Sequence, residues 1–183
     1  MTVSKSLATS RRPDLLYLYS DRTSIERARQ LGELCLQPSS TDVLRSTYVK
    51  ADQILPFGVR TPLGSTDFLT LRLSTAWHEA SFDGSHDIAA CLVIRDTEEF
   101  GERLHRAVQK ALPQWAGIDA AVAYGTSSPL GVAFTKDKHL SSQKEWLFAW
   151  RPIQANALLS PIVVQIGCMD SFADVRELRP VAQ

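Results

Sequence analysis

Short segments of alternating or continuous apolar residues recur along the chain, and turn residues separate them. Segments of about four to eight residues with this pattern are typical of β-strands. We therefore expect strands at residues 15–20, 33–37, 68–74, 87–94, 118–124, 129–135, 146–150 and 162–166. The segment 87–94 is apolar almost throughout, which indicates a strand in the interior of a sheet.

Helix signals occur at fewer places. Thr23 and Glu26 have the spacing of a capping box, which predicts a helix through Leu31. Gly32 is expected to end this helix. A second helix is expected to begin at about residue 41, where apolar residues recur near one helical face.

Asp96 and Glu99 have the same spacing and predict a third helix, which runs to about Leu112. Its buried face is expected to carry the apolar residues Phe100, Leu104, Ala107, Val108 and Ala111. Residues 55–67 contain two prolines and two glycines and are expected to form a loop. Residues 172–177 are expected to form a single helical turn.

The order of these elements indicates the fold class. Helices lie in the first third of the chain and at about 97–112, and strands dominate the second half. This layout predicts an α+β fold with a mixed, mostly antiparallel sheet, because it lacks the regular alternation of a doubly wound fold. A chain of 183 residues fits one domain. We expect a flexible arm over residues 1–14 and a single domain over residues 15–183.

Composition limits the classes of function. Lys and Arg number 20, as do Asp and Glu, so the formal net charge is zero. A zero net charge argues against a general nucleic-acid-binding protein, although a local basic patch remains possible. No apolar run approaches the length of a membrane span, and the first residues lack the apolar core of a secretory signal. We therefore expect a cytoplasmic protein without a membrane partner.

The three cysteines are Cys35, Cys91 and Cys168, and none belongs to a CxxC motif or to a metal-ligand spacing. Cys35 and Cys91 lie in apolar segments, where a reduced thiol behaves as a small hydrophobic side chain. A reducing compartment is the simpler interpretation. A catalytic Cys–His pair is the alternative, although no neighbour in the sequence would activate these thiols.

Polar residues gather where three of the expected strands begin or end. They are Tyr17, Tyr19, Ser20 and Arg22 at the end of the first strand, Arg72, Ser74 and Thr75 at the end of 68–74, and Gln143 and Glu145 before 146–150. A carboxylate at the start of a strand has a rigid base and an open front, which is a common way to present a catalytic acid. Glu145 is therefore the first candidate for catalysis.

The order of these residues resembles the ADP-ribosyltransferase-like fold. Its members begin with a strand that carries Arg or His, then a helix and a G-x-L turn into a second strand, and LYLYSDRTSIERARQLGELCL has this shape. One class has a Ser-Thr-Ser motif on a middle strand, where this chain has Ser74-Thr75 followed by Ala76. The same class has Q-x-E or E-x-E before a late strand, where this chain has Gln143-Lys144-Glu145.

A longer pattern, over about residues 15–151, resembles an uncharacterised bacterial domain family. It consists of R-L-S-x-x-W, an apolar strand, a helix, V-x-Y, and F-x-K-x(5,7)-Q-x-E-W. Members of that family begin with a tyrosine-rich strand and carry a late K…E-x-E-x-R signature. This resemblance implies a scaffold but no particular activity.

The first resemblance implies an NAD-dependent ADP-ribosyltransferase or an NAD glycohydrolase, with NAD as substrate. Glu145 would stabilise the oxocarbenium-like ribose, and Gln143 would orient the acceptor. The implied NAD-binding residues are Tyr19 and Trp77 against nicotinamide, Ser74 and Thr75 at the ribose or in support of Glu145, and Arg22 or Arg72 at the pyrophosphate. The acceptor would be a protein or a nucleic acid. The implied roles are bacterial toxin, effector or phage-defence protein, with a possible cognate antitoxin or partner protein.

Two other classes of function stay open. One is a non-catalytic interaction module on the same scaffold, which the missing third serine and the late position of Arg22 favour. The other is a nucleotide-modifying enzyme or nuclease that uses His78, Glu79, His86 and Asp87 with a divalent metal. These four residues lack a standard ligand spacing, so a surface loop is the simpler interpretation and no metal site is predicted.

Other polar and aromatic residues have structural interpretations. Trp146 and Trp150 share one strand face by their even spacing, which predicts that both pack in the core. His105 lies between two arginines and is expected on the solvent face of its helix. Lys136-Asp137-Lys138 and the neighbouring His139 are expected to form a solvated turn.

Overall fold

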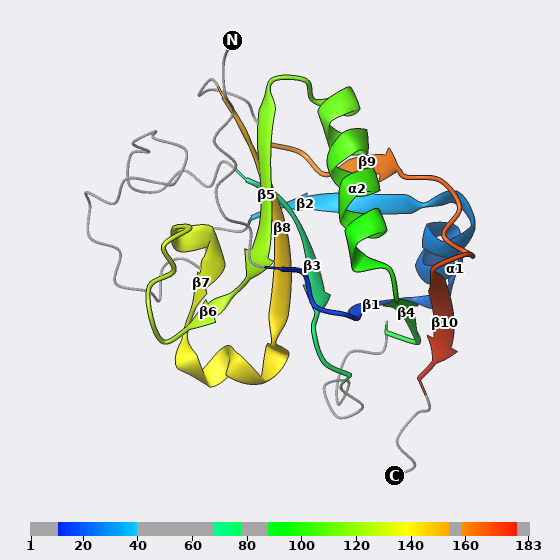
Figure 1. Cartoon of the computed structure of the whole chain (residues 1–183), viewed down its shortest axis with the longest axis horizontal. Helices are drawn as coiled ribbons and strands as arrows, with labels where there is room; N and C mark the ends of the chain where they lie inside the picture. Colours follow the sequence, from blue (N-terminus) through cyan, green and yellow to red (C-terminus); the bar gives the residue numbers. More distant parts are fainter. Residues whose placement is uncertain (1–10, 40–67, 78–87, 154–158, 179–183) are drawn as a thin grey trace.

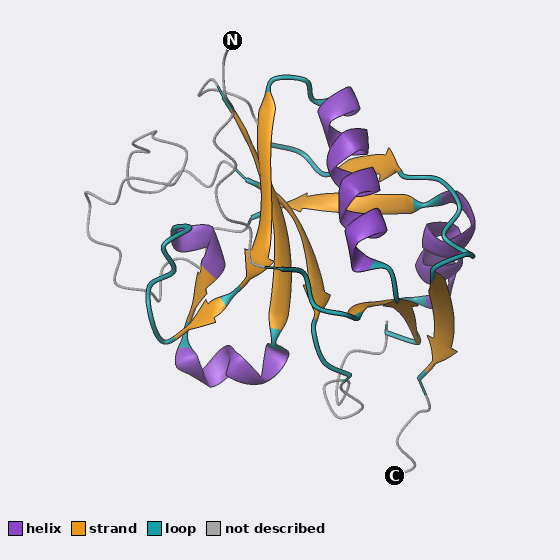
Figure 2. Ribbon diagram, in the orientation of Figure 1, coloured by secondary structure: helices purple, strands orange, loops and turns teal. Residues whose placement is uncertain are grey.

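The computed structural model describes residues 11–39, 68–77, 88–153 and 159–178. Within this part of the chain, eight strands form one antiparallel sheet (Figures 1 and 2). They are β1 (Leu16–Ser20), β2 (Glu33–Pro38), β3 (Leu69–Ser74), β4 (Ala90–Ile94), β5 (Trp115–Ala121), β8 (Glu145–Pro152), β9 (Ile162–Gln165) and β10 (Ala173–Glu177). With two α-helices, these strands make the single α+β domain that the pattern predicts.

β3 is the junction of the sheet. One edge of β3 pairs with β8, from Leu69 opposite Trp150 to Ser74 opposite Glu145. Its other edge is shared, because β1 pairs at the Ser74 end and β2 pairs at the Leu69 end. The sheet continues from β1 to β4 and β10, from β2 to β9, and from β8 to β5. β4 therefore lies inside the sheet, as its apolar sequence predicts.

The first helix, α1 (Arg22–Leu31), is capped by Asp21 and not by Thr23. The Asp21 carboxylate accepts a hydrogen bond from the Ser24 backbone N–H at 2.9 Å, so the first turn already has its acceptor. Gly32 ends the helix as predicted, with a φ of 67°. A Cβ there would lie 2.3 Å from the Gly167 carbonyl oxygen, so this close approach of two backbones requires glycine.

The second helix, α2 (Thr97–Ala111), begins as predicted. Asp96 is its N-cap and accepts from the Glu99 backbone N–H at 2.9 Å. Its buried residues include Phe100, Leu104 and Val108, and Ala107 packs beside them. Ala111, in the last turn, is exposed and not buried as expected. Periodicity identifies the apolar face of a helix but not how far that face stays covered.

The two faces of the sheet are covered by different parts of the chain. Residues of α1 and α2 pack on one face, with Trp146, Phe148 and Trp150 of β8 among the strand residues beneath them. The prediction that both tryptophans belong to the core is confirmed. On the other face, Leu147 and Ala149 pack with Ala120, Val122, Phe134 and Phe68. The residues between β5 and β8 cover this second cluster.

That connection contains β6 (Ala123–Tyr124), β7 (Thr135–Lys136) and two 3-10 turns, η3 (Val132–Phe134) and η4 (Lys138–Gln143). β6 and β7 form a short parallel pair. The expected strand at 129–135 is therefore wrong, because Gly131, with a φ of 99°, opens the 3-10 turn η3 there.

The expected helical turn at 172–177 is also wrong. Residues 173–177 form β10, which pairs with β4 over all five of its residues. The free edge of β4 offers a full row of backbone partners, and this outweighs the weak local helix preference of so short a segment. β9 is consequently not the last strand of the chain.

Some expectations fall outside the described residues. They are the helix from about residue 41, the loop at 55–67, and the group His78, Glu79, His86 and Asp87. Residues 1–10 of the arm expected over 1–14 lie outside them as well. Neither of the two α-helices in the described part of the chain is long and apolar enough to cross a membrane.

Candidate functional site

Glu145 opens β8 on the sheet face that the helices leave uncovered. Side chains alternate along a strand, so Glu145 and Leu147 point away from the core that contains Trp146 and Phe148. The Glu145 side chain is only 13% exposed. It therefore does not point into bulk solvent, and it contacts neighbouring side chains instead.

The nearest of these neighbours is Lys136, the second residue of β7. Its Nζ atom lies 2.5 Å from Glu145 Oε2 and 3.1 Å from Gln143 Oε1. The Lys136 side chain is 8% exposed, so the expected solvated turn is wrong at this residue. Lys138 and His139 are exposed, as expected. Charge and sequence position alone could not separate Lys136 from Lys138, because only the turn of the chain decides which lysine faces the sheet.

Tyr124, at the end of β6, completes the immediate surroundings of Glu145. The Glu145 backbone N–H donates to the Tyr124 hydroxyl at 2.9 Å. Burial raises the pKa of Tyr124, and the nearby Glu145 carboxylate raises it further, while the positive charge of Arg72 opposes this rise. The Tyr124 hydroxyl therefore keeps its proton and can donate a hydrogen bond to an acceptor at the site.

Ser74 and Thr75 fasten the end of β3 to the turn before β8. Ser74 Oγ lies 2.8 Å from the Ala76 carbonyl oxygen and 3.2 Å from that of Gln143. Thr75 bonds the Lys144 carbonyl oxygen twice, through its hydroxyl at 2.9 Å and its backbone N–H at 2.8 Å. Both hydroxyls are thus engaged with the backbone, and they support the position of Glu145.

Three further predicted residues lie on the same side of the sheet. Arg72 is exposed, sits two residues before Ser74 on β3, and makes no ion pair with the described residues. Tyr19 and Trp77 are half-buried, with ring centroids 6.1 Å apart. Tyr17 packs against both rings, at 6.4 Å from Tyr19 and 5.9 Å from Trp77. The structure therefore gathers most of the predicted site on one face.

Arg22 does not join this group. Its guanidinium pairs with Glu177 of β10 at 2.7 Å, and both side chains are well exposed. From β10 to β8 the sheet order is β10, β4, β1, β3, β8. Four strand spacings separate the two positions, roughly 19 Å at the usual spacing of about 4.8 Å. Of the two arginines considered for a pyrophosphate, only Arg72 is on the Glu145 side.

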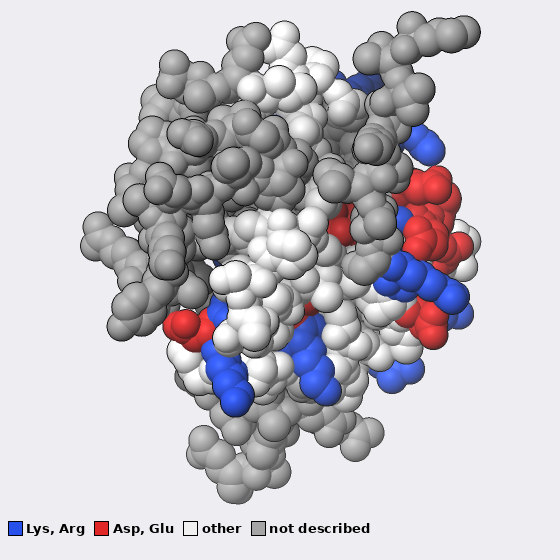
Figure 3. Space-filling view, turned by 60° about the vertical axis from the view of Figure 1, so that its left-hand side comes forward, with Lys and Arg blue, Asp and Glu red and all other residues white. Residues whose placement is uncertain are grey.

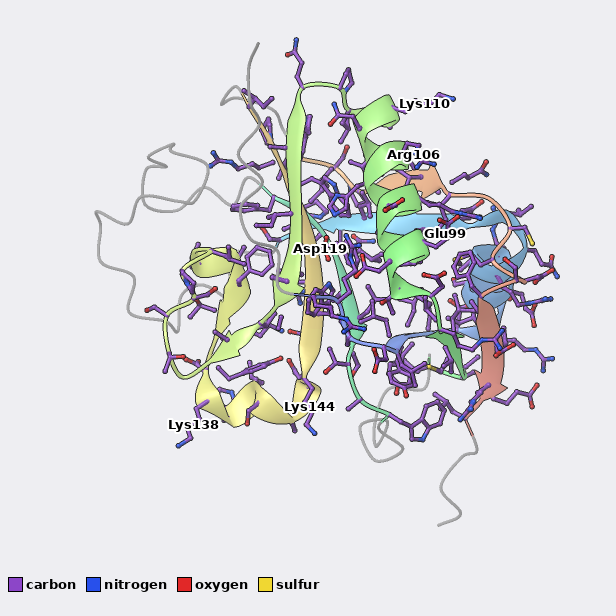
Figure 4. All side chains as sticks on the ribbon, viewed as in Figure 1. Glu99, Arg106, Lys110, Asp119, Lys138 and Lys144 are labelled. Atoms are coloured by element: carbon purple, nitrogen blue, oxygen red, sulfur yellow. The ribbon has the colours of Figure 1, made fainter. Side chains whose placement is uncertain are left out.

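A second polar cluster was not predicted and centres on Asp119 of β5. Asp119 is 1% exposed and lies between the sheet and α2 (Figure 4). Its carboxylate accepts two hydrogen bonds from Arg12, at 2.8 Å each, and one from Trp146 Nε1 at 2.9 Å. His105 Nε2 lies 2.7 Å from Asp119 Oδ1. The sequence held one signal for this cluster, an Asp inside an otherwise apolar strand. A carboxylate buried in that way requires hydrogen-bonding partners.

The expectation that His105 faces solvent is therefore wrong. Trp150 Nε1 donates to His105 Nδ1 at 3.2 Å, so Nδ1 is an acceptor and Nε2 carries the proton donated to Asp119. Burial alone would raise the pKa of Asp119, but the hydrogen bonds of His105 and Arg12 and the charge of Arg12 together lower it to about 2. With both ring nitrogens occupied, this cluster stabilises the fold and has no free group for proton transfer.

The cysteines show no sign of a catalytic thiol. Cys91 is buried on β4, and burial raises its pKa to about 12, so it stays protonated. Cys35 is exposed and not buried as expected, because it points outward from the alternating strand β2. Cys168 is also exposed. All three are free thiols.

Within the described ranges, neither a metal-binding cluster nor a cleft offers an alternative to the Glu145 site. No group of three or more His, Cys, Asp or Glu side chains there is placed to hold a metal ion. An open cleft of about 480 Å³ lies between residues 11–14, the start of α2 and residues 171–172. Its lining mixes arginines with acids and does not include Glu145.

No family model, no curated protein and no solved structure matches this chain.

Proposed function

We propose that this protein cleaves NAD at the Glu145 site, as an ADP-ribosyltransferase or an NAD glycohydrolase on an ADP-ribosyltransferase-like scaffold. One observation carries the proposal: a largely buried carboxylate, held by Lys136, shares a sheet face with Arg72, Tyr19 and Trp77. A carboxylate, a cation and aromatic rings are the groups needed by a ribose, a pyrophosphate and a nicotinamide ring.

The reaction breaks the bond between ribose C1′ and the nicotinamide nitrogen. The electron pair of that bond stays on nicotinamide, and positive charge develops on the ribose. The Glu145 carboxylate stabilises this charge more strongly in the transition state than in the ground state. Water or an acceptor nucleophile then bonds to C1′ and releases one proton to solvent. The products are nicotinamide and either ADP-ribose or an ADP-ribosylated acceptor.

Each neighbour of Glu145 has a role in this scheme. Lys136 fixes the direction of the carboxylate through the ion pair at 2.5 Å. A carboxylate has about four lone-pair sites, so Oε1 can accept from a ribose hydroxyl while Oε2 contacts Lys136. Gln143 orients the incoming nucleophile. Ser74 and Thr75 act indirectly, by holding the backbone of residues 143 and 144.

The same ion pair favours the alternative of a non-catalytic interaction module. Lys136 already neutralises Glu145, and a carboxylate satisfied in this way can serve only to fasten β7 to the sheet. On this alternative, the sheet face opposite the helices binds a partner protein and NAD is not consumed. The two functions differ in one measurable quantity, the release of nicotinamide.

The deciding experiment measures nicotinamide release from NAD by chromatography, with purified wild-type protein, Glu145→Gln and Glu102→Gln. Glu102 is an exposed residue of α2 and provides the same change of charge away from the site. We expect release by the wild type and by Glu102→Gln, and none by Glu145→Gln. Turnover that persists in Glu145→Gln would disprove the assignment, and its absence in all three would favour the interaction module.

A parallel measurement uses labelled NAD with cell lysate. Label that appears on a macromolecule with the wild type but not with Glu145→Gln would identify a transferase, and free ADP-ribose alone would identify a glycohydrolase. Growth arrest on expression that the same substitution relieves is expected if the protein acts as a toxin.

A further inference from the structure

Cations that make no ion pair with the described residues lie beside aromatic rings along one edge of the molecule. We call this edge the lower rim and define it by Tyr19, Trp77, Lys138, Lys144 and Arg176. In Figure 1 the ends of β3 and β10 and the turn η4 all lie at this edge. Thr75 joins the parts, because its hydrogen bonds to Lys144 bring the chain that leads to Trp77 beside the start of β8.

The lysines of the lower rim differ from most basic residues of the described chain. Six arginines form ion pairs with acids at 3.2 Å or less: Arg12, Arg22, Arg27, Arg29, Arg95 and Arg103. Lys138 and Lys144 are exposed and make no ion pair with the described residues. In Figure 3, acidic and basic atoms interleave on the right, whereas uncharged atoms surround most of the basic side chains near the lower edge.

The backbone holds both lysines in place. Lys144 has a φ of 43°, in the left-handed region that residues other than glycine and asparagine rarely adopt. Lys138 packs against Gly125, where an added Cβ would lie 2.9 Å from the Lys138 Cβ. The two lysines stand at opposite ends of the turn η4 (Figure 4). At a 3-10 rise of about 2.0 Å per residue, they are roughly 12 Å apart.

The aromatic part of the rim carries its own cation. The Arg176 guanidinium lies 5.7 Å from the centroid of the Trp77 ring, and Arg176 is exposed. Trp77 is half-buried and packs against Tyr19 and Tyr17, which fixes its ring. Fixed aromatic rings beside unpaired cations are the arrangement that binds single-stranded nucleic acid, in which bases stack and phosphates are neutralised.

We infer that the lower rim binds single-stranded nucleic acid, with phosphates at Lys138 and Lys144 and a base stacked at Trp77. Because the rim borders Gln143 and Glu145, the bound strand is also the acceptor of ADP-ribose. This second statement rests on the proposed function, whereas binding itself does not.

The test measures the binding of a fluorescein-labelled, single-stranded oligodeoxynucleotide by fluorescence anisotropy, without NAD and over a series of salt concentrations. The charge variant is Lys138→Gln combined with Lys144→Asn, because asparagine tolerates the left-handed backbone and leaves the turn intact. The matched control is Arg106→Gln combined with Lys110→Gln. These two exposed residues make no ion pair within the described part of the chain and lie on α2, toward the other end of the molecule (Figure 4).

We expect the charge variant to weaken binding roughly tenfold and to reduce the slope of log K against log salt by about 1.4, since each phosphate contact contributes about 0.7. The control is expected to bind like the wild type. Trp77→Leu is expected to weaken binding roughly tenfold, whereas Trp77→Phe keeps a ring and most of the affinity. Equal affinity in the charge variant and the control, or no binding at low salt, would overturn the inference.

The acceptor role is tested separately, with labelled NAD and the same oligonucleotide. Wild-type protein is expected to label the strand, and Glu145→Gln is expected to bind it equally well without labelling it. Nicotinamide release without label on the strand would refute the acceptor role. If the strand binds at the rim but no variant or wild type consumes NAD, the proposed function fails and the binding surface stands.

Discussion

At the residue scale, two side chains of the same chemical type have different roles because their surroundings differ. Asp119 and Glu145 are both carboxylates on strands, but their partners differ. Asp119 accepts from Arg12, His105 and Trp146 and is almost wholly buried. Glu145 has one cation and a partly exposed side chain. Asp119 is therefore a structural anchor, whereas Glu145 has a single ion pair with the described residues and keeps a small exposed fraction.

The pH dependence of folding tests the anchor. The pKa of Asp119 is about 2 in the folded protein, below its ordinary value of 3.8. A folded-state pKa that is lowered stabilises the protein above the ordinary value, and this contribution is lost as pH falls toward the folded value. It amounts to about 2 kcal/mol. We expect the free energy of unfolding, measured with urea, to fall by about this amount between about pH 5 and pH 2.

Asp119→Asn supplies the comparison. This variant is expected to be less stable at neutral pH, because Arg12 and His105 lose a charged acceptor, and to show less decline in acid. An acid decline as steep as that of the wild type would show that other carboxylates cause it.

At the element scale, a short buried ion pair fastens the connection between β5 and β8 to the sheet. β6 and β7 have two residues each, too few to hold this connection by backbone pairing alone. Lys136 reaches from β7 to Glu145, and the Val122 backbone N–H donates to the Glu145 carbonyl oxygen at 3.0 Å. The apolar side chains around Phe134 bury the rest of the connection.

A double-mutant cycle measures the strength of this fastening. Lys136→Met leaves Glu145 largely buried without its cation, and we expect a loss of about 3 kcal/mol in the free energy of unfolding. Adding Glu145→Gln to that variant is expected to restore part of the loss, because neither charge is then unpaired. Strictly additive effects would mean that the two residues do not interact. Lys110→Met, on the exposed face of α2, serves as the control and is expected to change stability little.

At the scale of the whole molecule, an early segment of the chain is tied to distant strands. Arg12 is 12% exposed and binds Asp119, which is 107 residues away in the sequence. The Thr97 hydroxyl donates to the Pro13 carbonyl oxygen at 2.7 Å. Residues 12 and 13 are thus linked to β5 and to the start of α2. Polar contacts, and not the apolar core alone, therefore hold the first described residues against the rest of the domain.

Substitutions of two neighbouring arginines test how much this contact contributes to stability. Arg12→Ala leaves Asp119 buried without its strongest partner and is expected to reduce the free energy of unfolding by about 3 kcal/mol. Arg11→Ala removes a side chain that is 89% exposed and pairs only at 4.0 Å with Asp14, so a change within about 0.5 kcal/mol is expected. Chemical denaturation compares the two. Equal effects would contradict an anchoring role that is specific to Arg12.

The sequence alone determined the elements whose signals are local. Alternation predicted most strands of the sheet, and the Asp96–Glu99 spacing predicted the start of α2, because backbone hydrogen bonding and capping depend on neighbouring residues. Strand-end position also selected Arg72, Ser74 and Glu145, which the structure places on one face.

Only the tertiary structure decided which of those side chains meet. It placed Arg22 away from the candidate site, and it buried Lys136 while Lys138 stayed exposed. It also made residues 173–177 a strand beside β4 and brought Arg12 and His105 to Asp119. The reason is physical: the burial of a charge and the pairing of a strand edge depend on partners that the chain brings from far away. No local pattern records them.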